Sequence, residues 1–141
     1  MTSPDTDTRS VIVEQEFPHP PAKVWRALTE SSLIEQWLLK NDFQPVAGHS
    51  FSLRRDPVGN WNGVIDCQVI TVDPCKSLSY SWGTMGVGTV VTFTLTPTGN
   101  GTHLRMEQSG FRPGQGANYK GAQYGWRGFI NGLEKVVAGL E

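Results

Sequence analysis

The last two dozen residues of the chain place the strongest constraint on its fold. Residues 118–141 read NYKGAQYGWRGFINGLEKVVAGLE and carry the only long helical period in the sequence. Such a helix is stable only when its apolar stripe is covered, so we expect the rest of the chain to supply a matching apolar surface. The stripe comprises Tyr119, Ala122, Trp126, Phe129, Ile130, Leu133, Val136, Val137 and Leu140.

Glycines are concentrated beside this stripe. A glycine in a helix interior costs roughly 1 kcal/mol relative to alanine, so a cluster of them calls for a structural reason. Close approach of a neighbouring element is the default reason. A second reason, compatible with the first, is that the glycines leave space beside the helix, as the wall of a cavity would. The glycines concerned are Gly121, Gly125, Gly128, Gly132 and Gly139.

Composition indicates one globular domain, which we place at residues 10–141. The 141 residues are 38% hydrophobic and 18% charged, and they include five Trp and six Phe. A net charge of −1 gives no electrostatic basis for binding nucleic acid or an anionic membrane. No apolar run approaches the length needed to span a bilayer.

The N-terminus and the cysteines favour a cytoplasmic location. Residues 1–9 lack the basic and apolar regions of a signal peptide, and we expect them to form a disordered tail. Cys67 and Cys75 are eight positions apart and match no zinc-ligand spacing, so we predict two free, buried or half-buried thiols and no metal site.

The middle of the chain alternates between apolar and polar residues. We predict two short helices, the second with a capping box formed by Ser32 and Glu35, and a flexible loop at residues 83–88. An antiparallel sheet curved around the C-terminal helix covers both apolar surfaces, which gives an α+β domain. The predicted helices span residues 22–28 and 31–38, and the six predicted strands span residues 10–17, 49–55, 64–72, 77–82, 89–96 and 103–108.

Five motifs in this order resemble the family of activators of the heat-shock-protein-90 ATPase, within the START-like (SRPBCC) superfamily. They are PPAKVWRALTESSLIEQWL at 20–38, Gly48 with Phe51, VDPCKSLSYSW at 72–82, GTHLRMEQSGF at 101–111 and YGWRGFINGLEKV at 124–136. The resemblance covers nearly the whole chain. It implies a helix-grip fold with an apolar cavity, which some relatives use to bind hydrophobic ligands and the polyketide cyclases use for chemistry.

The aromatic and polar residues with inward parity are the candidates for such a cavity. A buried Trp or Tyr needs a partner for its polar hydrogen, which a cavity rim or a ligand can supply. Each residue has core packing as its alternative role. The candidate ligand-binding residues are Trp37, His49, Phe51, Tyr80, Trp82, Phe93, Gln108, Trp126 and Phe129.

Catalysis has weaker support in the sequence. There is no GxSxG, HExxH or phosphate-loop motif, so we assign no catalytic residue and expect no cofactor. An enzyme could still be assembled from His49, Asp66, Tyr80 and Gln108, and the strand pattern does not assign the face of Asp66. The sequence therefore leaves turnover undecided.

Three functions follow, in decreasing order of support. The first is binding of a small hydrophobic or aromatic molecule between sheet and helix. The second is a cyclase or hydrolase acting on a polyketide-like or aromatic substrate. The third is a protein-interaction role, including chaperone modulation. The eukaryotic co-chaperone of the family uses a further N-terminal domain for much of its chaperone contact, and we expect neither that domain nor a chaperone partner here. Homodimerisation is left open.

Overall fold

The computed structural model describes residues 9–59, 61–84, 87–112 and 116–140. The predicted disordered tail lies outside these residues except for Arg9, which begins the first strand. The elements in chain order are β1 (Arg9–Phe17), α1 (Pro21–Thr29), α2 (Ser31–Trp37), β2 (Lys40–Asn41), β3 (Ser50–Arg54), β4 (Val64–Asp73), β5 (Ser77–Thr84), β6 (Val87–Pro97), β7 (Thr102–Phe111) and α3 (Gly116–Ala138).

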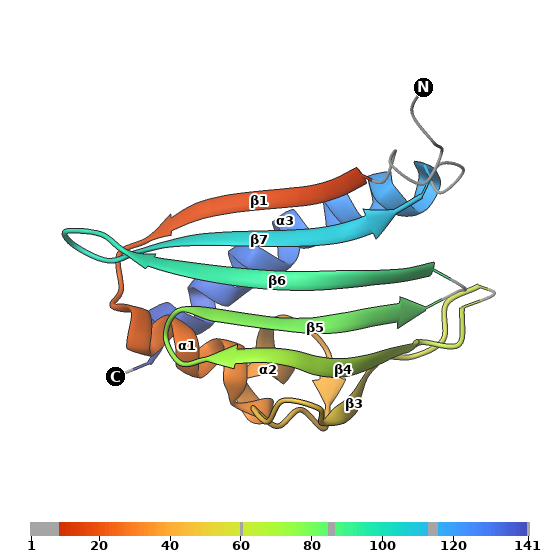
Figure 1. Cartoon of the computed structure of the whole chain (residues 1–141), viewed down its shortest axis with the longest axis horizontal. Coiled ribbons are helices and arrows are strands. Elements are labelled where there is room, and N and C mark those ends of the chain that lie inside the picture. The colour runs from red at the N-terminus through yellow and green to blue at the C-terminus, as the bar shows by residue number, and fades with distance from the viewer. Residues whose placement is uncertain (1–8, 60, 85–86, 113–115, 141) are drawn as a thin grey trace.

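The described strands form one antiparallel sheet that curves in front of α3, as Figure 1 shows. Its order is β1-β7-β6-β5-β4-β3-β2, so the chain starts at one edge, crosses to the other through α1 and α2, and returns strand by strand. This arrangement confirms the predicted α+β helix-grip fold. The sheet has seven described strands, not the predicted six, because Lys40 and Asn41 pair with Arg54 and Leu53. A two-residue strand is too short to show an alternating pattern.

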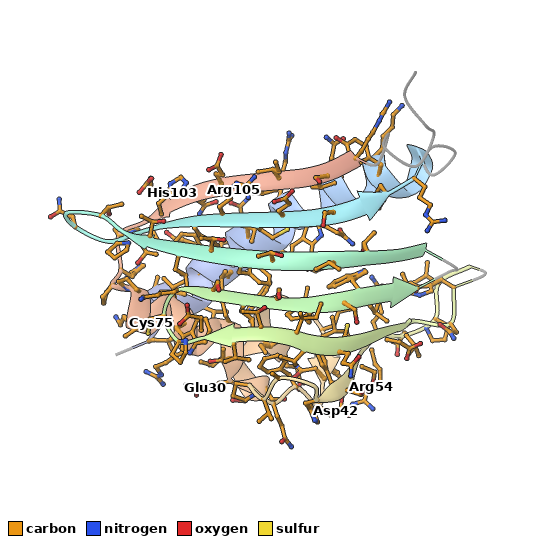
Figure 2. All side chains as sticks on the ribbon, in the orientation of Figure 1. Glu30, Asp42, Arg54, Cys75, His103 and Arg105 are labelled. Carbon is orange, nitrogen blue, oxygen red and sulfur yellow. The ribbon has the colours of Figure 1, made fainter. Side chains whose placement is uncertain are left out.

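Strand β7 shows how the period of two separates the interior from solvent. Leu104 and Met106 are fully buried, and Gln108 follows them on the inner face at 3% exposure. The residues between them, His103, Arg105 and Glu107, face away from α3, as predicted. Figure 2 shows His103 and Arg105 in the first half of β7, the half that follows the β6–β7 turn. The inner row of this strand therefore brings one amide into an apolar interior.

Helix α3 covers the inner face of the sheet. Trp126, Ile130, Leu133 and Val137 on its stripe are at most 2% exposed, and each fully buried side chain of this kind stabilises the fold by roughly 1.5–3 kcal/mol. The helix begins at Gly116, two residues before the predicted start, and ends at Ala138. In the described residues no helix is both long enough and apolar enough to cross a membrane.

The glycines of α3 serve both of the predicted purposes. A Cβ atom on Gly132 would lie 3.6 Å from the Cβ of Trp37, so this glycine allows α2 to pack closely on α3. A Cβ atom on Gly121, near the start of the helix, would meet nothing within 4 Å, and one on Gly128 would point into solvent. The helix is therefore tightly packed in its C-terminal half and has open space beside parts of its N-terminal half.

Helices α1 and α2 form a nearly continuous pair that closes one end of the sheet. The predicted capping box at Ser32 and Glu35 is wrong, because α2 begins at Ser31 with Glu30 as its N-cap and no side-chain capping bond. The backbone oxygen of Glu30 accepts from Leu33 and Ile34 instead. Since Glu30 also ends α1, no separate polar cap is needed between the two helices.

Two further expectations change at the strand ends. The predicted loop at residues 83–88 is mostly sheet, since Gly83 and Thr84 belong to β5 and pair with Gly88 and Val87 of β6. Residues 85 and 86 lie outside the described residues. His49 was expected to start a strand and point inward, but β3 begins at Ser50.

Both cysteines are free thiols, as predicted. Cys67 lies in the core at 5% exposure, and Cys75 is half-buried in the β4–β5 turn. Burial, followed by the nearby carboxylates of Asp66 and Asp42, raises the pKa of the Cys67 thiol to about 12. The thiolate is the reactive form of cysteine, so Cys67 is a packing residue at neutral pH.

We expect the outer face of the sheet to make folding stability depend on pH through His103. Its Nε2 lies 3.0 Å from Glu14, and its Nδ1 contacts Glu16. These hydrogen bonds, that of Glu14 first, raise the pKa of His103 above 6.5. The stabilisation is complete below the unfolded-state pKa and disappears as pH rises through the higher folded-state value.

An NMR titration of the His103 ring, with urea midpoints measured across the same pH range, checks this expectation. The variant carrying Glu14→Gln and Glu16→Gln should return the midpoint of the ring towards 6.5 and remove this part of the pH dependence. A His103 midpoint at or below 6.5 in the native protein would show that the two carboxylates do not stabilise the imidazolium.

Candidate functional site

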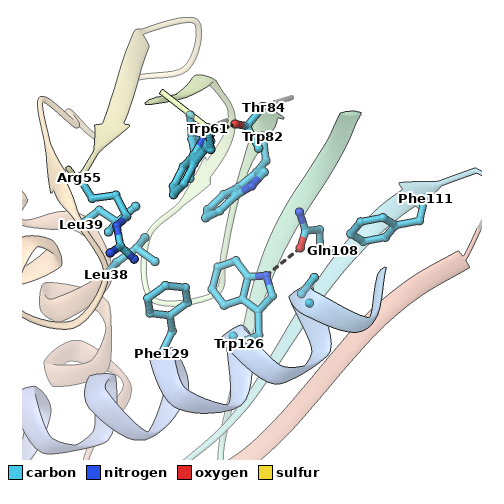
Figure 3. A pocket seen from close by; sticks show the side chains of 14 residues that line it. Leu38, Leu39, Arg55, Trp61, Trp82, Thr84, Gln108, Phe111, Trp126 and Phe129 are labelled. Carbon is cyan, nitrogen blue, oxygen red and sulfur yellow. Dashed lines mark hydrogen bonds between the residues drawn. The ribbon is translucent and has the colours of Figure 1, made fainter. Parts of the chain in front are cut away.

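A cavity of about 650 Å³ opens between the sheet and the N-terminal half of α3 (Figure 3). It is bordered by α3, by β4, β5 and β7, by the connection between β3 and β4, and by the two residues after α2. Its size falls in the range of small-molecule sites in proteins. The lining residues are Leu38, Leu39, Arg55, Trp61, Ile65, Trp82, Thr84, Gln108, Phe111, Gly121, Ala122, Gly125, Trp126 and Phe129.

Aromatic rings form much of the wall of the cavity. The ring centroids of Trp82 and Trp126 are 5.3 Å apart, and Phe129 packs edge-on to Trp126 at 5.6 Å. Figure 3 shows Trp61 beside Trp82 at the top of the view and Phe111 on the far side of Gln108. Tilted and edge-on ring pairs of this kind are the favoured aromatic geometries, so the wall is stable without a ligand.

One buried chain of hydrogen bonds holds two of these tryptophans. The indole Nε1 of Trp126 donates to Oε1 of Gln108 over 2.7 Å, and Nε2 of Gln108 donates to Oγ1 of Thr89 over 2.8 Å. The Thr89 hydroxyl donates in turn to the backbone oxygen of Trp82. All three side chains are at most 5% exposed. The chain ties α3 to β7, β6 and β5.

Gln108 keeps further hydrogen-bonding capacity on the cavity wall. A glutamine amide can donate twice and accept more than once, and this chain uses one hydrogen and one acceptor position. A hydroxyl or carbonyl group of a ligand could therefore bond to Gln108 without breaking the existing chain.

Trp61 borders the cavity on the sheet side. Its Nε1 donates to Oγ1 of Thr84 over 2.7 Å, and the Thr84 hydroxyl donates to the backbone oxygen of Val64 over 3.0 Å. Trp61 also forms an isolated bridge with Val58. The ring is thus held by polar contacts at its nitrogen, which leaves its apolar faces available to the cavity and to Arg55.

The backbone around Arg55 is fixed by a glycine. Arg55 N–H donates to the oxygen of Gly63 over 2.9 Å, which closes the connection between β3 and β4. Gly63 has φ +81°, and a Cβ atom there would lie 2.1 Å from the Arg55 oxygen, so only glycine fits. The Arg55 guanidinium carbon lies 6.0 Å from the centre of the Trp61 ring.

Of the nine residues predicted to bind a ligand, four line the cavity. They are Trp82, Gln108, Trp126 and Phe129. Gln108 was identified from the alternation of β7, and Trp126 and Phe129 from the helical stripe. The structure therefore brings together residues that were predicted from the strand period of β7 and from the helical period of α3.

Four of the other predicted residues, Trp37, Phe51, Tyr80 and Phe93, lie in the core next to the cavity. The rings of Phe51, Tyr80 and Phe93 contact one another in series and the last contacts Trp126, at centroid distances of 5.2, 6.1 and 5.9 Å. Trp37 packs edge-on to Phe93, and its Nε1 donates to the backbone oxygen of Ala27 over 2.8 Å. These rings have the predicted inward parity, but α1 and α2 fill their half of the interior.

His49 is the ninth residue that was predicted to bind a ligand. It is half-buried, and its Nε2 contacts the backbone oxygen of Asp42 at 3.0 Å. Its ring stacks parallel to Phe51 at a centroid distance of 6.4 Å. It does not border the cavity.

Sequence reasoning missed Arg55, Trp61, Thr84 and Phe111 as lining residues. Residues 57–63 have turn composition, and turn composition does not show which side chains fold back over an interior. The one available signal was Trp61 itself, because a tryptophan is unusual in a stretch otherwise rich in Gly, Asn and Pro. Phe111 lies beyond the predicted strand at residues 103–108, whereas β7 continues to Phe111.

The polar residues considered for catalysis do not converge. Asp66 is exposed on β4, and His49 does not line the cavity. Tyr80 is buried in the core, where desolvation raises its pKa well above 10. Only Gln108 of that set lines the cavity. Within the described residues no three His, Cys, Asp or Glu side chains are grouped so that they could hold a metal ion.

The fold and the cavity define a helix-grip protein, and comparison with known families agrees. Residues 18–138 match the model of the Activator of Hsp90 ATPase homolog 1-like protein family. The chain belongs to this family, as the motifs in its sequence suggested. No match was found among curated proteins.

Solved structures show the same fold. Protein MLL2253 from Mesorhizobium loti is 50% identical, with 94% of this chain and 99% of that chain covered and a TM-score of 0.86. Bacillus halodurans protein BH1534 is 28% identical over 92% of this chain and 96% of its own, with a TM-score of 0.79. DynU16, from the dynemicin biosynthetic locus, is 26% identical over 92% of this chain and 47% of its own, with a TM-score of 0.77.

We expect the bond between Trp126 and Gln108 to contribute measurably to stability. Gln108→Leu leaves a buried indole N–H without its acceptor, which should lower the free energy of unfolding by roughly 1–3 kcal/mol. The same change should cost less in a Trp126→Phe background, where that donor is absent. Urea denaturation of the four proteins in this cycle measures the difference.

Gln36→Leu is a matched control, because Gln36 is exposed on α2, and it should change stability by less than about 0.5 kcal/mol. Equal costs for Gln108→Leu with Trp126 and with Phe at that position would mean that the bond itself adds nothing.

Proposed function

We propose that this protein binds a small hydrophobic or aromatic molecule in the cavity between the sheet and α3. The observation that carries the proposal is the combination of about 650 Å³ of open space with a wall made largely of aromatic rings. Clefts of this size with a mainly apolar wall are typical of small-molecule sites, which supports an occupant.

The chemistry of the wall supports an aromatic occupant. Trp61, Trp82, Trp126 and Phe129 offer ring faces and edges to which a planar molecule could stack. Gln108 provides one internal polar contact, which suits a ligand with a hydroxyl or carbonyl group. A few fixed polar groups in an apolar wall are typical of small-molecule sites.

Turnover has less support than binding. The described residues that line the cavity include no carboxylate, imidazole or thiol that could act as a general base. A protein-interaction role has less support too, because the exposed large apolar residues come from separate segments rather than from one element. They are Ile12, Val46, Val58, Ile70 and Tyr124.

The relatives fit a ligand-binding role without identifying the ligand. DynU16 comes from a biosynthetic locus, which is consistent with a fold that handles small molecules. The family name refers to chaperone activation, and nothing in the cavity favours that activity over binding. We further propose a single domain over residues 10–141 and a cytoplasmic location, which two free thiols support.

The test is binding of N-phenyl-1-naphthylamine, a neutral aromatic dye that becomes fluorescent in apolar sites. We expect saturable binding to the native protein and a rise in melting temperature with dye concentration. Gly125→Leu places a side chain where Gly125 now lines the cavity, and should weaken dye binding at least about tenfold through steric exclusion.

Gly128→Leu is the matched control, because Gly128 lies on the same helix, does not line the cavity and has no atom near its Cβ position. It should leave dye affinity unchanged. Equal loss of affinity in both variants, or no saturable binding to the native protein, would overturn the proposal.

A further inference from the structure

Arg55 is the one charged residue among the described residues that line the cavity. Its side chain is exposed, and Figure 3 shows its guanidinium directed from the β3–β4 connection towards the cavity. No carboxylate of the described residues forms an ion pair with it. Arg26 and Arg105, by contrast, form ion pairs with Glu30 and Glu107, respectively.

Contacts with uncharged groups hold the guanidinium of Arg55 in place and leave its positive charge uncompensated. Its backbone is fixed by the bond to Gly63, and its guanidinium lies over the ring of Trp61. A cation over an indole face keeps its full charge, and the in-plane N–H groups at the edge of the guanidinium stay free to donate. Trp61 is itself anchored by Thr84, so the position of Arg55 relative to the cavity is supported from two sides.

Nearby acidic residues do not remove this charge. Glu35 and Asp56 border a neighbouring hollow that Arg55 and Arg54 also line, but neither acid pairs with Arg55. The cavity wall itself holds no carboxylate among the described residues. A ligand that places an anion beside Arg55 would therefore gain a charge-assisted bond without displacing a protein partner.

We propose that the ligand is an aromatic carboxylate, with its rings between α3 and the sheet and its acid group paired with Arg55. This inference rests on the proposed binding function and narrows its ligand class. The planar fork of arginine matches the two oxygens of a carboxylate, and the aromatic wall beside it matches a planar ring system. Gln108, on the wall formed by β7, offers a polar contact to the remainder of the ligand.

The test compares 2-naphthoate with 2-naphthamide, a neutral molecule of nearly the same shape, by titration calorimetry at low ionic strength. We expect the carboxylate to bind the native protein about tenfold more tightly than the amide, and added salt to reduce this preference. In Arg55→Gln the preference should disappear, because the affinity for the carboxylate should fall by about tenfold more than the affinity for the amide.

Arg54→Gln is the matched control. Arg54 is the adjacent arginine, and it borders the neighbouring hollow but not the cavity. It lies on β3, next to the edge strand β2 (Figure 2). Because this variant removes the same net charge, it separates a specific pairing with Arg55 from the general field of the protein. It should keep the tenfold preference.

Binding of N-phenyl-1-naphthylamine distinguishes a failure of the carboxylate inference from a failure of the proposed binding function. If the neutral dye binds the cavity but 2-naphthoate binds no better than 2-naphthamide, or not at all, the carboxylate inference is overturned and the binding function stands. Equal loss of the preference in the Arg55 and Arg54 variants also overturns it. If the neutral dye does not bind, both proposals fail.

Discussion

The bond from the Trp126 indole to Gln108 is the contact on which the cavity end of this structure depends. Burying a tryptophan in an apolar interior is favourable only if its N–H finds an acceptor. Here the acceptor is a side-chain amide on β7, which is itself held by Thr89 on β6. The same contact docks α3 onto the sheet, positions the aromatic wall and leaves one polar group facing the space. Stability and the capacity to bind a ligand therefore share one set of atoms.

The interior divides into a closed half and an open half. At the closed end α1 and α2 pack on α3, and Gly132 allows the close contact with Trp37. The rings of Phe51, Tyr80 and Phe93 cover the inner face of the sheet there. At the open end no helix pair covers the sheet, and small residues of α3 leave room beside Trp126. Gly132 is thus explained by a packed tryptophan, and Gly121 and Gly125 are explained by the open space that they line.

Sequence periodicity predicted what depends on a repeating pattern. The order of elements, the inward row of β7 with Gln108, and the apolar stripe of α3 all follow from periods of two and 3.6. Residues fixed by irregular backbone could not be found in this way. Arg55 and Trp61 reach the cavity because Gly63, with its positive φ, folds the β3–β4 connection back on itself, and such a turn has no period. His49 stacks on the inward-facing Phe51, but it precedes β3 and does not line the cavity. Strand β2 is too short to carry a pattern.

The most direct test of the central claim uses the tryptophans themselves. Trp61, Trp82 and Trp126 line the cavity, whereas Trp25 and Trp37 do not. The indole N–H signals of Trp25 and Trp37 therefore serve as an internal control for those of the other three. We would titrate protein labelled with ¹⁵N in its tryptophans with N-phenyl-1-naphthylamine and record the indole region of the NMR spectrum. We expect the signals of Trp61, Trp82 and Trp126 to shift with a common saturation curve and those of Trp25 and Trp37 to stay in place. Shifts confined to Trp25 and Trp37, or uniform small shifts of all five, would contradict it.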